Sequence, residues 1–278
     1  MSLALANPVM VASGCGGTGR ELAAYGDPAE LGGFVTRSIT LAPRAGGHQP
    51  RIVETPSGLA HAVDLHNPGV DQFLALELPW LLQQGVTTFV SVVGRTLGEY
   101  AEIARRLGRT PGIAGVEVNL SPPDAAASSV FDAREPFHAA SVVAAVHRDL
   151  PRGVPVLAKV RPDPVRVAET ARAVLEAGAD AVVVGNALPA AMPDGRDAGL
   201  SGPAVRPLAV RCLTEVRAAL PDATVVACGG LATVDDVTTV LELGATAVQI
   251  GTALLHDPTT AHRLVGALAA PVAGEDEA

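Results

Sequence analysis

The sequence has few aromatic residues, few cysteines and a single lysine, Lys159. Phe, Tyr and Trp make up 3% of its 278 residues, and the three cysteines form no CxxC pair. Scattered cysteines in odd number argue against a disulfide framework and a cysteine-bound zinc ion, so no metal site is expected. No apolar run reaches the roughly 18 residues of a membrane-spanning helix, and the N-terminus lacks a signal-peptide pattern. These absences predict a cytoplasmic protein that does not insert into a membrane.

Acidic residues outnumber basic ones. The 29 Asp and Glu against 20 Lys and Arg give a formal net charge of −9. An acidic chain without a basic cluster is not expected to bind nucleic acid. At 48% hydrophobic residues the chain can bury a large core, and one α/β barrel of about 250 residues accounts for its length. We therefore expect a single domain over residues 1–278, with a frayed acidic tail at about 271–278.

The single lysine stands out because the remaining basic residues are all arginines. Where composition favours arginine, an exposed lysine is replaced at little cost, whereas a guanidinium cannot imitate a compact ammonium. Chance or a structural ion pair would also account for one lysine. The position of Lys159 at the end of an apolar run favours a functional role.

Short apolar runs alternate with longer amphipathic stretches. Nearly continuous apolar character is typical of strands buried on both faces. Eight such runs are present, at residues 8–12, 33–37, 87–92, 115–119, 154–159, 181–185, 224–228 and 247–250. The stretches between them predict helices, among them residues 100–107, 138–150, 166–177, 207–220 and 235–243. Thr233 is the expected N-cap of the last of these.

Eight alternations of strand and helix predict an α/β fold, a closed (β/α)8 TIM barrel. A doubly wound open sheet is the alternative, but no GxGxxG fingerprint follows the first strand. Two connections, residues 38–68 and 121–136, are too long for simple turns. Because both follow strands, we expect them at the carboxyl end of the barrel, where such enzymes carry their active sites.

Polar or glycine residues stand at the carboxyl ends of most predicted strands, which indicates a ligand across the barrel mouth. Gly229-Gly230 and Gly251-Thr252 follow the seventh and eighth strands. Glycines there let backbone N–H groups approach a phosphate, which is commonly bound at this place in such barrels. A buried lysine nearby stabilises negative charge on a ring or an oxyanion, with Schiff-base chemistry as the rival role.

Together these residues resemble the dihydroorotate dehydrogenase family of FMN-dependent (β/α)8 barrels, from residue 7 to about 258. NPVMVASG at residues 7–14 resembles the opening strand of the family, and GLSGPA at 199–204 its flavin-side loop. CGGL at 228–231 and GTA at 251–253 resemble its phosphate site. Without the N-terminal membrane-associating helices of class 2, the chain is similar to the class 1 branch.

The resemblance implies FMN as the cofactor, with Lys159 at the pyrimidine edge of the flavin, where reduced flavin carries negative charge. Lys159 and His61 are the candidate catalytic residues. The candidate cofactor-binding residues are Ala12, Ser13, Gly14, Arg37, Ser38, Asn119, Lys159, Gly185, Gly202, Gly229, Gly230, Gly251 and Thr252. The candidate substrate-binding residues are Arg37, His61, Asp64, Leu65, Asn119, Asp124 and Asn186.

The motifs that contact the substrate in this family are altered in the present sequence. The family's Lys-Ser-x-Thr reads RSIT at residues 37–40, and its Asn-x-x-Gly-Leu-x-Asn-Pro-Gly reads HAVDLHNPG at 61–69. Its Asn-x-Ser-Cys-Pro-Asn reads NLSPPD at 119–124. The catalytic cysteine of class 1, a serine in class 2, is therefore Pro122, which cannot accept a proton. Loop residues that could replace it are His61, Asp64, His66 and Asp124, and a histidine titrates near neutral pH.

These features predict an FMN-dependent oxidoreductase that transfers a hydride between flavin N5 and a CH–CH or C=C bond. The expected substrate is a small ring or acyl compound other than orotate. One alternative is a flavin-free phosphate-binding barrel such as an isomerase, synthase or aldolase. Another is a non-catalytic flavin-binding relative, which Pro122 favours. By resemblance we also expect a homodimer and an electron-transfer partner subunit, since the chain has too few clustered cysteines for an iron–sulfur cluster.

Overall fold

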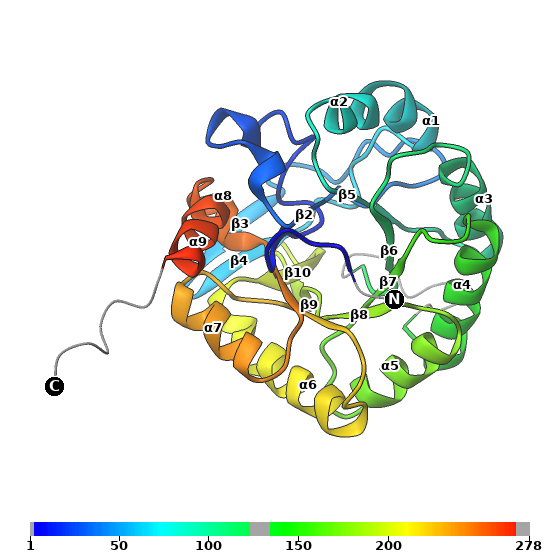
Figure 1. Cartoon of the computed structure of the whole chain (residues 1–278). Helices are drawn as coiled ribbons and strands as arrows, with labels where there is room; N and C mark the ends of the chain where they lie inside the picture. The colour runs from blue at the N-terminus through cyan, green and yellow to red at the C-terminus, as the bar shows by residue number, and fades with distance from the viewer. Residues whose placement is uncertain (1–2, 123–133, 271–278) are drawn as a thin grey trace, which may run out of the picture.

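Eight parallel strands close into a barrel in the computed structural model, which describes residues 3–122 and 134–270 (Figure 1). Around the barrel the order is β1-β12-β11-β8-β7-β6-β5-β2. The strands are β1 Val9–Val11, β2 Gly33–Val35, β5 Thr88–Val92, β6 Gly115–Asn119, β7 Val156–Val160, β8 Ala181–Val184, β11 Val225–Cys228 and β12 Ala247–Ile250. The sequence predicted all eight with small errors at their ends, and the closed barrel is confirmed.

Helices surround the barrel and bury one face each against it. They are α3 Leu97–Leu107, α4 Pro136–Asp149, α5 Val167–Glu176, α6 Arg206–Ala219, α7 Val234–Glu242, α8 Thr252–His256 and α9 Thr260–Ala269. Before β5, α1 Val70–Gln72, a π-helical turn over Phe73–Glu77 and α2 Leu78–Gln83 follow one another without a break. The predicted N-cap of α7 is confirmed, because Thr233 Oγ1 accepts a hydrogen bond from Asp236 N at 3.1 Å.

The first strand–helix unit differs from the expectation. Between β1 and β2 the described chain forms only two short 3-10 turns, Leu22–Ala24 and Pro28–Glu30, in place of an α-helix. Among the described residues, no helix is both long enough and apolar enough to span a membrane. The predicted acidic tail lies outside the described residues, and the single-domain organisation stays a prediction.

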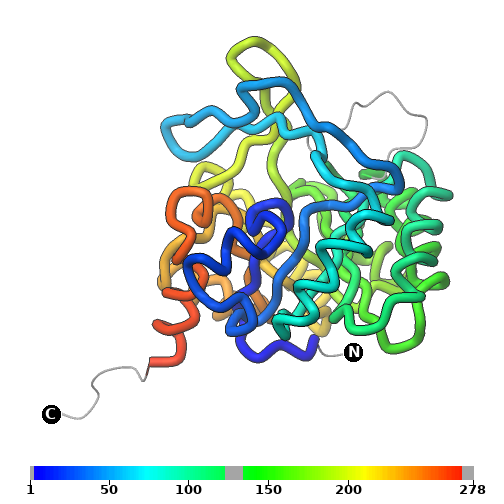
Figure 2. Tube along the Cα trace, turned by 90° about the horizontal axis from the view of Figure 1, so that it is seen from above, coloured from blue at the N-terminus to red at the C-terminus, as the bar shows by residue number. Residues whose placement is uncertain are grey.

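Residues 38–68, predicted to be a long loop, contain a hairpin that the sequence did not reveal. β3 Ile52–Thr55 and β4 Gly58–His61 pair with each other. β4 also pairs with β10 Asp197–Ser201, and β10 pairs with β9 Leu188–Ala191. This four-stranded antiparallel sheet, called the mouth sheet below, lies at the end of the barrel away from the N-terminus (Figure 2).

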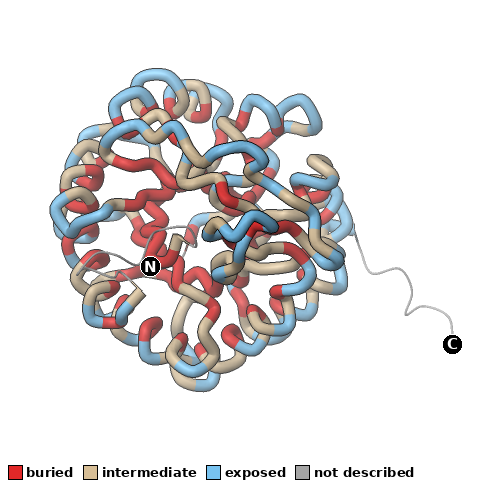
Figure 3. Tube along the Cα trace, turned by 180° about the vertical axis from the view of Figure 1, so that it is seen from behind, coloured by how far each residue is buried: buried red, intermediate tan, exposed pale blue. Residues whose placement is uncertain are grey.

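The core lies inside the barrel and between the barrel and the helices (Figure 3). Every residue of β5, β6 and β7 is buried, as expected for parallel strands that are covered on both faces. Alternate residues of a strand share a face, so Leu157 and Lys159 point to the same side of β7. Leu157 belongs to the apolar cluster inside the barrel. Lys159 therefore stands above that cluster, toward the mouth.

Candidate functional site

A cavity of about 860 Å³ lies between the carboxyl ends of the barrel strands and the mouth sheet. Its wall includes most of the residues that the sequence predicted to bind the cofactor or the substrate. These are Ala12, Ser13, Gly14, Arg37, Ser38, His61, Leu65, Asn119, Lys159, Asn186, Gly202, Gly229, Gly230, Gly251 and Thr252. The strand-end residues therefore meet at one site, and their individual roles stay predictions.

Three of the marked residues do not contribute to this wall as expected. Gly185 does not line the cavity, and a Cβ there would meet Pro162 at 2.8 Å. Asp64 does not line it either, since its carboxylate pairs with Arg44. Asp64 also takes a positive φ of 52°, at the place where the family pattern has a glycine. Asp124 lies outside the described residues.

Three glycines form one end of the cavity and leave no room for side chains. A Cβ at Gly230 would lie 2.7 Å from Arg206 Cβ and 2.8 Å from the carbonyl oxygen of Gly202. A Cβ at Gly202 would lie 2.7 Å from Gly58 Cα, and one at Gly229 3.0 Å from Ala209 Cβ. Gly202, Gly229 and Gly230 all have positive φ. This wall of backbone suits an anion that is bound through N–H groups.

A buried ammonium forms the floor of the cavity. Lys159 is 4% exposed and donates a hydrogen bond to Gln249 Oε1 at 2.8 Å. Burial acts to lower the pKa of Lys159, but Cys228, Glu117 and Cys15 act to raise it. The resulting pKa lies above the usual lysine value. The floor therefore carries a positive charge at neutral pH.

The two cysteines beside Lys159 are neutral near pH 7 and ionise only in the alkaline range, where they act on the Lys159 pKa. Burial raises the pKa of Cys15 to about 11, against the opposing effect of Lys159. Burial also raises the pKa of the Cys228 thiol. Because a thiol must ionise to act as a base or a nucleophile, neither cysteine replaces the base that the sequence lacks at Pro122.

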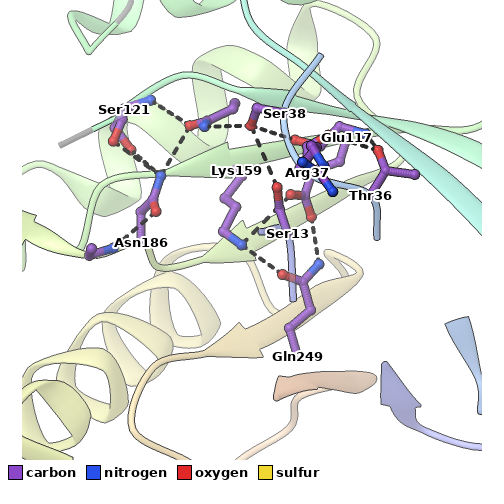
Figure 4. Close-up of polar contacts among 12 residues, drawn as sticks. Ser13, Thr36, Arg37, Ser38, Glu117, Ser121, Lys159, Asn186 and Gln249 are labelled. Atoms are coloured by element: carbon purple, nitrogen blue, oxygen red, sulfur yellow. Dashed lines mark hydrogen bonds and ion pairs between the residues drawn. The ribbon is translucent and has the colours of Figure 1, made fainter. Parts of the chain in front are cut away.

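A chain of hydroxyl and amide groups crosses the mouth of the barrel (Figure 4). Ser38 Oγ lies 2.9 Å from Ser91 Oγ and accepts a hydrogen bond from Asn119 Nδ2 at 3.0 Å. Asn186 Nδ2 lies 3.1 Å from Asn119 Oδ1 and 3.2 Å from Ser121 Oγ, and donates to both. These hydrogen bonds tie together strands β5 and β6 and the segments that follow β2 and β8.

Cationic and imidazole side chains also line the cavity. Arg37 follows β2, and its buried Nε has no hydrogen-bond partner among the described residues. His61 reaches the cavity from β4, where it pairs with Ile52 of β3 and Gly199 of β10. His66 and Glu54 line the same cavity. The cavity wall therefore holds groups that can bind an anion or transfer a proton.

Two residues that the sequence analysis missed lie just below the floor. Glu117 is fully buried in β6, and Gln249 is 1% exposed in β12. Glu117 stands between Val116 and Val118, and Gln249 stands between Val248 and Ile250. A single polar residue between two apolar ones was the signal that could have identified them. Within residues 3–122 and 134–270, no group of three or more His, Cys, Asp or Glu side chains is placed to hold a metal ion.

Comparisons with known proteins match nearly the whole chain to one family. A family profile described as dihydroorotate dehydrogenase matches residues 1–271. The chain is 38% identical over 277 residues to the catalytic subunit of dihydroorotate dehydrogenase B (NAD(+)) from Anoxybacillus flavithermus, covering 96% of this chain and 88% of the relative. The subunit of the same name from Desulforudis audaxviator is 42% identical over 268 residues, covering 93% and 86%.

A solved structure supports the architecture. The crystal structure of DHODH from Eimeria tenella in complex with ferulenol matches with a TM-score of 0.80. The match covers 94% of this chain and 80% of that one at 18% sequence identity, so this likeness establishes the barrel fold alone.

Proposed function

Because the chain belongs to the dihydroorotate dehydrogenase family, flavin-dependent oxidoreductases that act on a CH–CH bond, we propose that it binds FMN and that its substrate is not dihydroorotate. The substrate would be another small ring or acyl compound. The observation that carries the FMN proposal is the wall of three glycines, Gly202, Gly229 and Gly230, in the same cavity as a buried, positively charged lysine.

The residues present fit FMN. Gly202, Gly229 and Gly230 would surround its phosphate, where added side chains would collide with the wall. Lys159 would lie at the electron-rich edge of the ring, and its charge would favour the reduced cofactor. When bound, FMN supplies a hydride acceptor or donor at N5 of its ring.

The substrate half of the proposal rests on Pro122, which directly follows the buried Ser121. A proline side chain has no group that accepts a proton, so the cysteine chemistry of class 1 has no counterpart at this position. Ser121 does not line the cavity, and its hydroxyl accepts a hydrogen bond from Asn186. Ser121 is therefore not positioned to replace the missing base.

His61 is the group we propose for proton transfer. It lines the cavity from the mouth sheet, across from the barrel strands that carry Lys159 and Asn119. An imidazole both donates and accepts a proton near neutral pH. Arg37, which lines the same cavity, offers a fork of donors that matches a carboxylate or another planar anion.

Assembly is part of the proposal. The relatives are named as catalytic subunits with NAD(+) in the name of the enzyme, which supports an electron-transfer partner subunit for this chain. We also propose a cytoplasmic homodimer, which light scattering would detect as about twice the chain mass of 28.1 kDa.

The test begins with the visible absorption spectrum of the freshly purified protein and mass identification of the released cofactor. Bound FMN that is reduced by light and reoxidised by an alkene probe, but not reduced by dihydroorotate, supports the proposal. A colourless protein that does not bind added FMN overturns it and favours the flavin-free phosphate barrel. Bound FMN that no probe reoxidises favours the non-catalytic relative. Reduction by dihydroorotate overturns the substrate half.

A further inference from the structure

Three polar side chains from different strands meet inside the barrel below the cavity. Glu117 of β6, Lys159 of β7 and Gln249 of β12 are each at most 4% exposed. The next layer of the interior is apolar and includes Met10 and Phe89. Burying two charges and an amide is costly unless each is paired, so the pairing of these groups needs an explanation.

The three side chains form a closed ring of interactions (Figure 4). Lys159 Nζ donates to Gln249 Oε1 at 2.8 Å, and Gln249 Nε2 donates to Glu117 Oε2 at 2.5 Å. Lys159 Nζ and Glu117 Oε1 lie 3.7 Å apart and complete the ring as an ion pair. An ammonium only donates and a carboxylate only accepts, so the Gln249 amide can satisfy both in one orientation only.

Only one member of this ring faces the cavity. Lys159 lines the cavity, whereas Glu117 and Gln249 do not. Glu117 Oε1 is buried and has no hydrogen-bond partner among the described residues, and it forms an ion pair with Lys159. Among the three members of the ring, Lys159 is therefore the one through which the ring contacts the cavity.

We propose that Glu117 and Gln249 are positioning residues that hold the Lys159 ammonium at one place and in one charge state on the cavity floor. The inference deepens the proposed function, because a fixed positive charge at the floor is what a reduced flavin would face. A lysine side chain is long and flexible, and the Gln249 amide restricts where its ammonium lies. Glu117 supplies the counter-charge that the interior otherwise lacks.

The remaining titratable groups around Lys159 do not provide that counter-charge. Cys228, in β11, and Cys15, after β1, are the other groups that act to raise the pKa of Lys159. Burial raises the pKa of both thiols, so they are neutral near pH 7. At neutral pH this leaves Glu117, which lies in β6, as the anionic neighbour of the Lys159 ammonium.

The single lysine of the chain allows a direct test. Protein grown with lysine labelled with carbon-13 at the ε position gives one side-chain signal, and that signal reports Lys159 alone. The pH titration of this signal gives the pKa of Lys159, and it requires neither a substrate nor catalytic turnover. We would titrate the purified protein with bound FMN and after FMN removal.

Two variants are expected to shift this pKa in opposite directions. Glu117→Gln removes the counter-charge at nearly constant shape and lowers the Lys159 pKa by about one unit or more. Gln249→Glu places a second carboxylate beside the ammonium and raises the Lys159 pKa. Glu102→Gln, which removes a surface carboxylate paired with Arg106 on α3, is the matched control and leaves it unchanged.

Opposite shifts separate positioning from a structural role, since general loosening of the fold would move both variants the same way. A Lys159 pKa that stays at the wild-type value in both variants overturns the inference. If Glu117→Gln does not fold, the expected rise of the Lys159 pKa in Gln249→Glu still tests the inference. Absence of FMN would reject the proposed function and leave the lysine titration readable, so the two failures are distinguishable.

Discussion

Asn186 and Asn119 are joined across the barrel mouth, with Asn186 Nδ2 donating to Asn119 Oδ1 at 3.1 Å. The same Asn186 amide donates to the carbonyl oxygen of Ser121 at 3.1 Å. The backbone just before Pro122 is therefore fixed at the cavity edge. A side chain with proton-accepting chemistry placed at residue 122 would be held by this backbone, and Pro122 offers none.

Replacing Pro122 tests the missing base. We expect wild-type protein to show no reduction of its flavin by dihydroorotate, and Pro122→Cys to gain it. A positioned general base contributes of the order of 10²-fold, which sets the expected gain over Pro122→Ala. Pro122→Ala is the matched control, because it removes the proline ring without adding a base. The measurement is anaerobic bleaching of flavin absorbance after mixing with dihydroorotate. Equal rates in the two variants would contradict the assignment of residue 122.

His61→Asn tests the proposed proton donor and places an asparagine where the family pattern has one. Reoxidation of photoreduced enzyme by alkene probes, such as fumarate and 2-cyclohexenone, should slow by about 10²- to 10⁴-fold. Reoxidation by oxygen should not change, because that reaction needs no proton from His61. The control is His147→Asn, since His147 lies on α4 and does not line the cavity. A similar fall in the rate of reoxidation by oxygen would indicate that the substitution impairs flavin binding and not proton transfer.

Gly230→Ala tests the glycine wall. Gly230 has a φ of 72°, and its added Cβ would lie 2.7 Å from Arg206 Cβ and 2.8 Å from a backbone oxygen. We expect the affinity for FMN to fall by tenfold or more, as measured by fluorescence titration of the apoprotein. Gly195→Ala is the matched control: its φ is 84°, but no atom lies within 4 Å of the added Cβ. It shares the backbone strain of about 1 kcal/mol and should keep wild-type affinity. Equal affinity in both variants would show that the wall does not bind the cofactor.

Asp163 is expected to make stability depend on pH. Its carboxylate accepts hydrogen bonds from Arg161 Nη2 at 2.9 Å and from Val165 N at 3.2 Å. Burial acts to raise the pKa of Asp163, but these bonds lower it, and the resulting pKa lies below the usual value. A carboxyl with a lower pKa in the folded state stabilises above the unfolded pKa, and this contribution is lost as pH falls through the folded value.

Asp163→Asn should therefore lower the free energy of unfolding at pH 7 and have less effect below about pH 4, near the unfolded pKa of aspartate. Urea unfolding at both pH values provides the measurement. Asp222→Asn, at an exposed aspartate in the turn after α6, is the control and should change stability little at either pH. An equal loss at pH 7 and at acid pH would contradict the linkage.

The barrel was predictable because its strands are buried on both faces. Such strands appear in the sequence as continuous apolar runs, and their ends are marked by residues such as Asn119 and Lys159. The mouth sheet was not predictable for the opposite reason. In β3 the residues alternate between exposed and half-buried, and β9 contains Pro189. Its pairing partners are also far apart in the sequence, so no local pattern brings β4 and β10 together.

The site was predictable where composition or spacing carried a signal. The single lysine and the paired glycines identified the floor and one wall of the cavity. The positions of Gly185 and Asp64 outside the wall depend on how loops turn after their strands, which the sequence pattern does not specify. Glu117 and Gln249 were hidden in strands that otherwise read as apolar core.

The pairing of His61 with Gly199 also bears on the order in which the molecule folds. β4 and β10 lie on either side of the segment that contains β5, β6, β7 and β8, so their pairing closes a long loop. Such contacts are costly in chain entropy until the intervening strands are in place. We therefore expect the mouth sheet to form last and to be the first part that opens in the native state. Ligand release would then report local opening of this sheet and not the stability of the barrel below it.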